Sequence, residues 1–246
     1  MHLRLLGTTG YHPTDRRQTA CLMLPEIGVV LDAGTGMYRV GRLLKTNTLD
    51  IFLTHSHLDH IIGLTYLFSV LAGHEHVAVR VHGQAEKLEA IAEHLFAPPI
   101  FPAMPPLTWQ PLAEHVPLQD NGRLSWFSLN HPGGSVGYRL DWSDRSMAYV
   151  TDTTADPQAD YVDKIRGVDL LVHECYFPDG KEELAQSTGH SWATPVAQVA
   201  RAAGVRRLLL VHIDPSADSQ DPLGLEKMRA IFPQIQIAED GQAIDF

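Results

Sequence analysis

The stretch 54–60, THSHLDH, concentrates four side chains that can bind a metal. His55, His57, Asp59 and His60 lie within six positions, and imidazole and carboxylate are the usual ligands of zinc and related divalent ions. In an extended segment His55 and His57 point to the same side, because strand side chains alternate. Asp59 and His60 come where a helix is expected to begin and can reach a second position. The spacing therefore predicts two metal ions, and the alternative is a histidine-rich surface turn that binds none.

Three further ligand types follow strand-like runs later in the chain. His131 comes after the run 123–128, Asp152 after 145–150, and His212 after 207–211. Alone, a histidine or aspartate at a strand end is more often a cap or a surface residue. Together with the 54–60 cluster they make seven ligands, the number that two metals sharing one carboxylate need.

Apolar patterning predicts which elements position these residues. We expect strands that start each half of the chain and helices that end it, which indicates two sheets packed face to face with helices outside. The strands are expected at 2–6, 19–24, 27–31, 49–53, 76–81, 123–128, 135–141, 145–150, 168–172, 207–211, 235–238 and 243–245. The helices are expected at 37–45, 59–72, 84–95, 192–203 and 226–232. Prolines make 97–111 an irregular loop, either a flap over a site or a stiff connector.

Composition narrows the class of protein. The 246 residues contain no linker or repeat, which favours a single domain over 1–246. Two cysteines exclude a disulfide framework, no stretch is apolar enough to span a membrane, and the N-terminus lacks the pattern of a secretion signal, so a cytoplasmic location is expected. The net charge of −10 disfavours extended nucleic acid as a partner, although two bound cations would still attract a small phosphorylated substrate.

The motifs and their order resemble those of the metallo-β-lactamase superfamily, and most closely its tRNase Z-type phosphodiesterase branch. The resemblance runs from Leu6 to His212 and rests on LGTTGYHPTDRRQTACLM, VVLDAGTG, THSHLDH, HPGGSVGYRL, TDT, LLVHE, GHS and LLLVH. It implies an α/β fold of the four-layer αββα type. It also implies one metal on His55, His57 and His131, a second on Asp59, His60 and His212, and Asp152 as the bridge between them.

The resemblance also suggests catalytic roles. Asp59 would bind metal and orient or deprotonate the attacking water, and His190 in the GHS motif would be the general acid that protonates the leaving alkoxide. Glu174 would orient His190 by a hydrogen bond. The alternatives are a structural residue at a helix start for His190 and an ordinary loop carboxylate for Glu174.

Anion contacts are expected from two further places. Backbone N–H groups of Gly133, Gly134 and Ser135 would approach an anionic substrate, unless these residues only form a tight turn. Arg16 and Arg17 are expected as a solvated pair, with a phosphate contact as the alternative.

The expected function is a dinuclear hydrolase that attacks small or cyclic phosphodiesters through a metal-bridging hydroxide. His131 and Asp152 are only 21 positions apart, which leaves no room for the long arm that bacterial tRNase Z enzymes carry there. Three alternatives stay open: a tRNA 3′-processing endonuclease, a lactone or thioester hydrolase acting on a carbonyl, and a non-catalytic metal-binding protein. Zn²⁺ is the expected metal, Mn²⁺ or iron fits the same ligands, and relatives of this kind often form homodimers.

Overall fold

The computed structural model describes residues 1–217 and 219–246, which divide into two compact units. Unit 1 comprises residues 1–113 with 239–245, and unit 2 comprises residues 114–238 with Phe246. Each unit contains a seven-stranded sheet together with helices. The expected fold class, α/β with two sheets and helices, is confirmed, and the interpretation of 1–246 as one domain stays a prediction.

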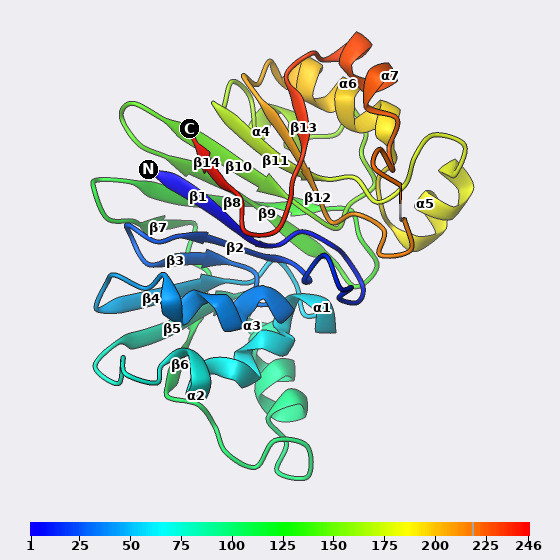
Figure 1. Cartoon of the computed structure of the whole chain (residues 1–246). Coiled ribbons are helices and arrows are strands. Elements are labelled where there is room, and N and C mark those ends of the chain that lie inside the picture. Colours follow the sequence, from blue (N-terminus) through cyan, green and yellow to red (C-terminus); the bar gives the residue numbers. More distant parts are fainter. Residues whose placement is uncertain (218) are drawn as a thin grey trace. The chain divides into compact units, whose positions relative to one another are not determined.

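Unit 1 holds the sheet β14-β1-β2-β3-β4-β5-β6 (Figure 1). Its strands are β1 (His2–Gly7), β2 (Cys21–Leu24), β3 (Val29–Leu31), β4 (Thr48–Phe52), β5 (Ala78–Gly83), β6 (Leu107–Pro111) and β14 (Ala243–Asp245). Its helical segments are η1 (Thr35–Arg42), α1 (Leu58–Ile61), η2 (Ile62–Tyr66), α2 (Leu67–Val70), α3 (Ala85–Ala90) and η3 (Ile91–Leu95). Strand β2 runs antiparallel to β1 and β3, whereas β3 to β6 are parallel to one another, so β1, β3, β4, β5 and β6 point the same way.

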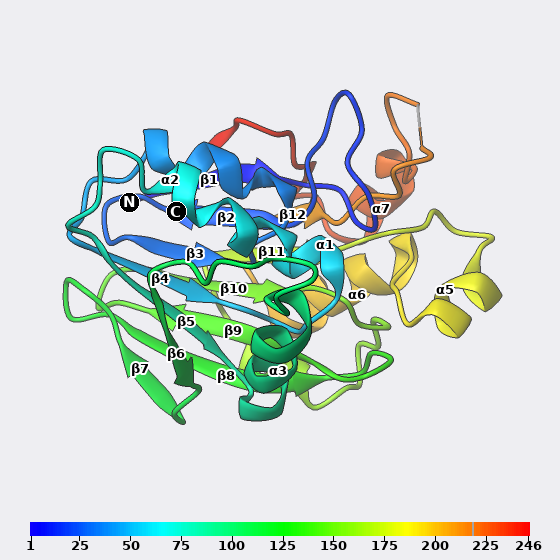
Figure 2. The same ribbon diagram turned by 90° about the horizontal axis from the view of Figure 1, so that it is seen from below.

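Alternation along the strands of unit 1 builds its core. In β5, Val79 and Val81 are buried in the apolar cluster while Arg80, on the other face, is exposed. Segments η1, α1 and α2 lie along one face of this sheet in Figure 2, and Met37 of η1, Leu67 of α2 and other side chains from these segments fill the same cluster. The carboxyl ends of parallel strands are where α/β proteins place ligands, and β4 ends directly before the 54–60 motif.

Unit 2 holds the sheet β13-β12-β11-β10-β9-β8-β7. Its strands are β7 (His115–Pro117), β8 (Arg123–Leu129), β9 (Ser135–Asp141), β10 (Ser146–Val150), β11 (Leu170–Glu174), β12 (Leu208–Val211) and β13 (Ile235–Ile237), and its helices are α4 (Tyr161–Lys164), α5 (Glu182–Thr188), α6 (Ala193–Ala203) and α7 (Leu225–Ile231). Strands β10 to β13 are parallel, and β8 points the same way because β9 is antiparallel to both β8 and β10. Helix α6 buries Val196 and Val199 in the cluster that also contains Leu171 and Leu210 of the sheet.

Several element boundaries differ from the expectation. The stretch 97–111 is irregular only as far as Pro106, because Leu107–Pro111 pairs with β5 as an edge strand, where prolines are tolerated. The helix expected over 59–72 is three short segments, α1, η2 and α2. Strand β7 and helices α4 and α5 were not expected, since they are short and carry little apolar periodicity.

In the described part of the chain, no helix combines the length and the apolar character that crossing a membrane requires. The cytoplasmic location stays a prediction.

Candidate metal centre

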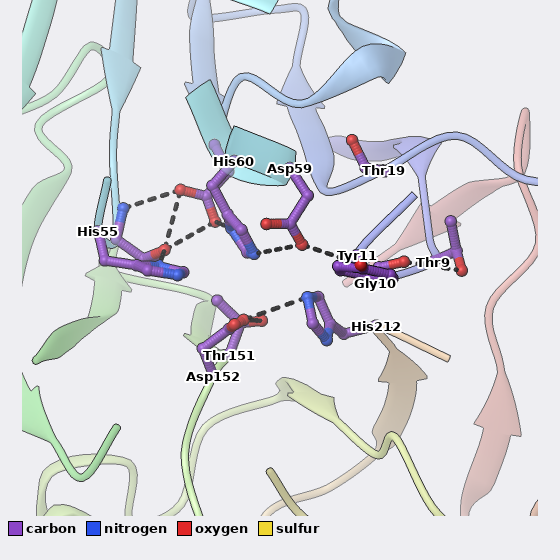
Figure 3. A network of polar contacts seen from close by, with 12 residues as sticks. Thr9, Gly10, Tyr11, Thr19, His55, Asp59, His60, Thr151, Asp152 and His212 are labelled. Carbon is purple, nitrogen blue, oxygen red and sulfur yellow. Dashed lines mark hydrogen bonds and ion pairs between the residues drawn. The ribbon is translucent and has the colours of Figure 1, made fainter. Parts of the chain in front are cut away.

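In unit 1 the candidate ligands come from one continuous segment that follows β4. Asp59 and His60 lie in the first turn of α1, and Asp59 Oδ2 is 3.4 Å from His60 Nε2. The ring of His55 lies 4.5 Å from that of His57 and 4.3 Å from that of His60, measured between centroids. The sequence therefore folds locally so that all four side chains gather at the end of a strand. Figure 3 shows His55, Asp59 and His60, and its dashed lines include the contacts of Asp59 and His60.

Asp32 lies behind these ligands, and its local sequence pattern gave no sign of this role. Its buried carboxylate accepts a hydrogen bond from His60 Nδ1 at 2.9 Å, and from the N–H and hydroxyl of Thr54. The Thr54 hydroxyl oxygen then accepts from Nδ1 of His55 at 3.0 Å. These bonds fix the tautomer of both rings and leave Nε2 as the candidate ligand atom. Carboxylates that hold the far nitrogen of a histidine are typical of metal sites.

In unit 2 the candidate ligands follow three strands that end at the same edge of the sheet. His131 follows β8, Asp152 follows β10 and His212 follows β12, and all three are buried. Asp152 Oδ2 is 3.5 Å from His131 Nε2, and Asp152 Oδ1 is 3.3 Å from His212 Nε2. Two ligand atoms on one tetrahedral ion, each about 2.1 Å from it, lie roughly 3.4 Å apart. Each oxygen of Asp152 therefore has the ligand spacing to a different histidine.

The local backbone and the surrounding groups hold these ligands in place. Asp152 and His212 have φ values of 49° and 55°, in the left-handed region that non-glycine residues rarely occupy. Such conformations are typical of functional sites. His131 Nδ1 donates to the carbonyl of Gly189 at 2.9 Å, which directs Nε2 toward Asp152. Burial lowers the pKa of His131 although Asp152 opposes this shift, so the neutral, metal-binding form of the ring is favoured.

His190 and Glu174 form the expected hydrogen bond. His190 Nδ1 donates to Oε1 of the fully buried Glu174 at 3.2 Å, and Glu174 also accepts the N–H groups of Thr153 and Ser191. Glu174 ends β11, the strand next to those that precede Asp152 and His212. The His190 ring stacks on Tyr176 at 4.7 Å between centroids, a contact that nothing in the sequence indicated.

His190 lies close enough to the ligands of unit 2 to act on a group that they hold. Ligand atoms of Asp152, His190 and His212 lie within 4.8 Å of one another. Its ring centroid is 5.2 Å from those of both His131 and His212. The imidazole is partly exposed, unlike the three buried ligands. A partly exposed histidine on a buried carboxylate is suited to moving a proton.

The turn after His131 supports the ligands. The Ser135 hydroxyl donates to the carbonyl of Asp152 at 2.7 Å, and the Gly134 N–H donates to the carbonyl of His131 at 2.8 Å. Gly133 and Gly134 both have φ of 77°, and a Cβ at Gly134 would meet nothing within 4 Å. The turn is thus open on one side. Substrate binding by Gly133, Gly134 and Ser135 stays a prediction.

The expected solvated pair Arg16–Arg17 is wrong for Arg17. Its guanidinium is buried, donates to the Thr8 hydroxyl at 2.6 Å and pairs with Glu239 at 2.8 Å. Arg16 pairs with the same carboxylate. Both arginines therefore help to hold the loop that contains them in place.

The donor set of each unit fits divalent ions. The histidines whose tautomer can be assigned present Nε2, and neighbouring imidazole and carboxylate atoms have the spacing of ligands on one ion. The clustered histidines and aspartates support binding of divalent metal.

Comparisons with known proteins agree with this chemistry. Residues 28–213 match the family model described as "Beta-lactamase superfamily domain". A protein named ribonuclease Z from Acaryochloris marina (strain MBIC 11017) is 30% identical over 303 residues, which covers 98% of this chain and 96% of that protein.

Two solved structures share the fold over nearly the whole chain. The metallo-β-lactamase fold protein YhfI from Bacillus subtilis has a TM-score of 0.80 at 16% identity and covers 99% of both chains. Human tRNase Z, short form, has a TM-score of 0.77 at 20% identity and covers 100% of this chain and 99% of the other. The resemblance to the metallo-β-lactamase superfamily, its tRNase Z-like branch and its fold is therefore confirmed: the chain belongs to this superfamily and is one of its metal-dependent hydrolases.

Proposed function

We propose that the ligands of the two units form one dinuclear centre that hydrolyses small phosphodiesters. The observation that carries the proposal is the position of Asp152, whose two carboxylate oxygens approach two different histidines. A carboxylate in this position suits a bridge between two ions. The first ion would have His55, His57 and His131, the second Asp59, His60 and His212, and Asp152 would serve both.

Two bound ions would supply an activated water and neutralise the charge of a phosphodiester. The chain's own residues do the rest. Asp59 holds its carboxylate at the start of α1, where it can orient the attacking water. His190 keeps Nδ1–H on Glu174, so the opposite nitrogen can deliver a proton to the leaving alkoxide. The buried Glu174 carboxylate stabilises the protonated ring in that role.

The size of the connections supports a small substrate. Strands β9 and β10 are joined by only four residues, 142–145, so the segment between His131 and Asp152 carries no arm. The match to the Acaryochloris ribonuclease Z extends over 303 positions, whereas this chain has 246 residues, so at least 57 positions of the match have no counterpart here. A net charge of −10 is also unfavourable for a long polyanion.

Maturation of RNA 3′ ends is the second candidate, because one observation favours it. Two of the relatives that match 98% of this chain are named ribonuclease Z. An activity on precursor tRNA would need neither a change of metal chemistry nor a change of general acid.

The test compares four substrates on protein loaded with Zn²⁺ or Mn²⁺. We expect hydrolysis of bis(p-nitrophenyl) phosphate and of a 2′,3′-cyclic nucleotide, with weaker or no cleavage of a precursor tRNA and no opening of an acyl lactone. Efficient removal of the tRNA trailer at nanomolar enzyme would favour the second candidate. Lactone hydrolysis without phosphodiester turnover would reject both, and no turnover at all by metal-loaded protein would favour a binding role.

A further inference from the structure

Tyr11 is the most exposed large hydrophobic side chain among the described residues and lies in a strained loop. Its relative exposure is 75%, and its φ of 61° is in the left-handed region. Bulky side chains rarely occupy that region, where glycine or asparagine is the usual choice. A single exposed aromatic residue is ordinary. An aromatic residue that is both exposed and held in a costly backbone conformation is not.

The backbone of Tyr11 contacts the candidate centre. Its N–H donates to Oδ2 of Asp59 at 2.8 Å (Figure 3). The loop that carries Tyr11 leaves the carboxyl end of β1, which points the same way as β3 and β4 and therefore ends at the same edge as the 54–60 motif. The side chain of Tyr11 is therefore attached to the Cα next to the nitrogen that is hydrogen-bonded to Asp59, a proposed metal ligand.

The loop is fixed at its base by acidic residues from the last turn of unit 1. Asp240 Oδ1 accepts from the Thr8 hydroxyl, and its Oδ2 accepts from the N–H of Gln18 and from Arg39, at 2.6–2.8 Å. The backbone N–H of Thr9 also donates to the carbonyl of Gln18. Both ends of the segment 8–18 are therefore tied together. A tied loop presents its side chain with little entropy left to lose on binding.

We propose that the Tyr11 ring is a stacking platform for the planar base of a nucleotide-type substrate whose phosphodiester lies at the metal centre. The inference rests on the proposed function and adds the substrate class to it. Every base has a π-face, and stacking on an exposed aromatic ring needs no positive charge, which suits an acidic chain. A phosphate held near Asp59 leaves the attached base within reach of the ring.

Two variants separate the ring from the backbone. Tyr11→Asn removes the ring but keeps the N–H that binds Asp59, and asparagine tolerates positive φ. Tyr11→Phe keeps the ring. The matched control is Phe68→Ala, which removes another exposed aromatic ring of unit 1, 49% exposed, from α2. Thermal unfolding by circular dichroism checks that all three variants fold.

The first measurement is binding of AMP and of ribose 5-phosphate to metal-loaded protein by calorimetry. Tyr11→Asn should weaken AMP binding about tenfold and leave ribose 5-phosphate within twofold, because stacking of one base contributes at this level. Tyr11→Phe and Phe68→Ala should match the wild type for both ligands. Equal affinities of wild type and Tyr11→Asn for AMP, or equal losses for both ligands, would overturn the proposal.

The second measurement is kcat/KM for 2′,3′-cyclic AMP and for a base-free ribose cyclic phosphate. Tyr11→Asn should lower only the first value, by about tenfold. If the wild type cleaves both substrates and Tyr11→Asn does not discriminate between them, the stacking role fails while the proposed function stands. If the wild type cleaves neither, the proposed function fails.

Discussion

The two units provide metal ligands in different ways. Unit 1 places four of them in the single segment 55–60, and one of these, His57, is exposed. Unit 2 collects three buried ligands from the ends of β8, β10 and β12. A local segment needs only a strand and a helical turn to gather its ligands. The ligands of unit 2 come from separate strands, so their positions depend on the correct pairing of the whole sheet. We therefore expect a lost ligand in unit 2 to be replaced less easily by a neighbouring side chain.

The largest expected effect comes from Asp152, whose carboxylate oxygens lie near His131 and His212 in unit 2. Asp152→Asn should lower the bound metal from two ions to less than one and reduce phosphodiesterase activity more than 100-fold, beyond the loss typical of supporting residues. His57→Ala, in unit 1, should remove one ion and most activity. Elemental analysis of both variants measures the difference. If Asp152→Asn keeps two ions, the bridging role is wrong; full metal and activity in His57→Ala would refute that ligand.

His190 tests whether unit 2 also contains the proton donor. His190→Ala should retain metal but slow cleavage of substrates with poor leaving groups by about 10²–10⁴, whereas substrates that leave as nitrophenolate should be affected little. The comparison of an alkyl with a nitrophenyl phosphodiester measures this. Equal losses on the two substrates would indicate a structural or ligand role. Glu174→Gln serves as the companion variant, since it weakens the same hydrogen bond without removing the ring.

The third prediction concerns the support of the ligands in unit 1. Asp32→Asn should lower metal affinity about 10–100-fold, because the carboxylate holds both His60 and Thr54. A competition titration with a chelator measures the affinity. Asp50→Asn is the matched control, since Asp50 also binds a histidine, His82, but on the strand pair β4–β5. Similar metal affinities in the two variants would remove Asp32 from the site.

Much of this arrangement could be predicted from the sequence, and the exceptions have physical reasons. The seven candidate ligands each follow an apolar run, a signal that needs no tertiary information. Asp32 also follows such a run, but its role depends on β3 pairing with β4 in parallel, with Leu31 opposite Phe52, which brings Asp32 beside Thr54. Strand β6 was hidden because prolines flank and end it, and an edge strand tolerates them. Tertiary pairing, rather than local pattern, decides both cases.

The smallest expected effect concerns the pair Asp50–His82, which we expect to stabilise the fold, in contrast to the pair Asp32–His60, which we expect to support metal binding. Burial alone would raise the pKa of Asp50, but hydrogen bonds from His82 and Arg80 outweigh it and lower the pKa. A carboxyl whose folded pKa is lowered stabilises the fold above its unfolded pKa, about 3.9, and loses that contribution as pH falls through the folded value. Asp50→Asn should therefore cost about 1–2 kcal/mol at pH 7, a value discounted because Arg80 is half exposed.

Denaturant unfolding at pH 7 and pH 3, with and without chelator, measures this contribution. The difference between wild type and Asp50→Asn should shrink toward pH 3, because protonation removes the same charge that the substitution removes. It should not depend on chelator, since Asp50 supports no ligand. Asp32→Asn should differ, because the part of its effect that acts through His60 should disappear once metal is removed, whereas its weakened bonds to Thr54 should cost stability with and without metal. A chelator-dependent effect of Asp50→Asn would mean that both histidine–carboxylate pairs of unit 1 are coupled to the metal, and the contrast between them would fail.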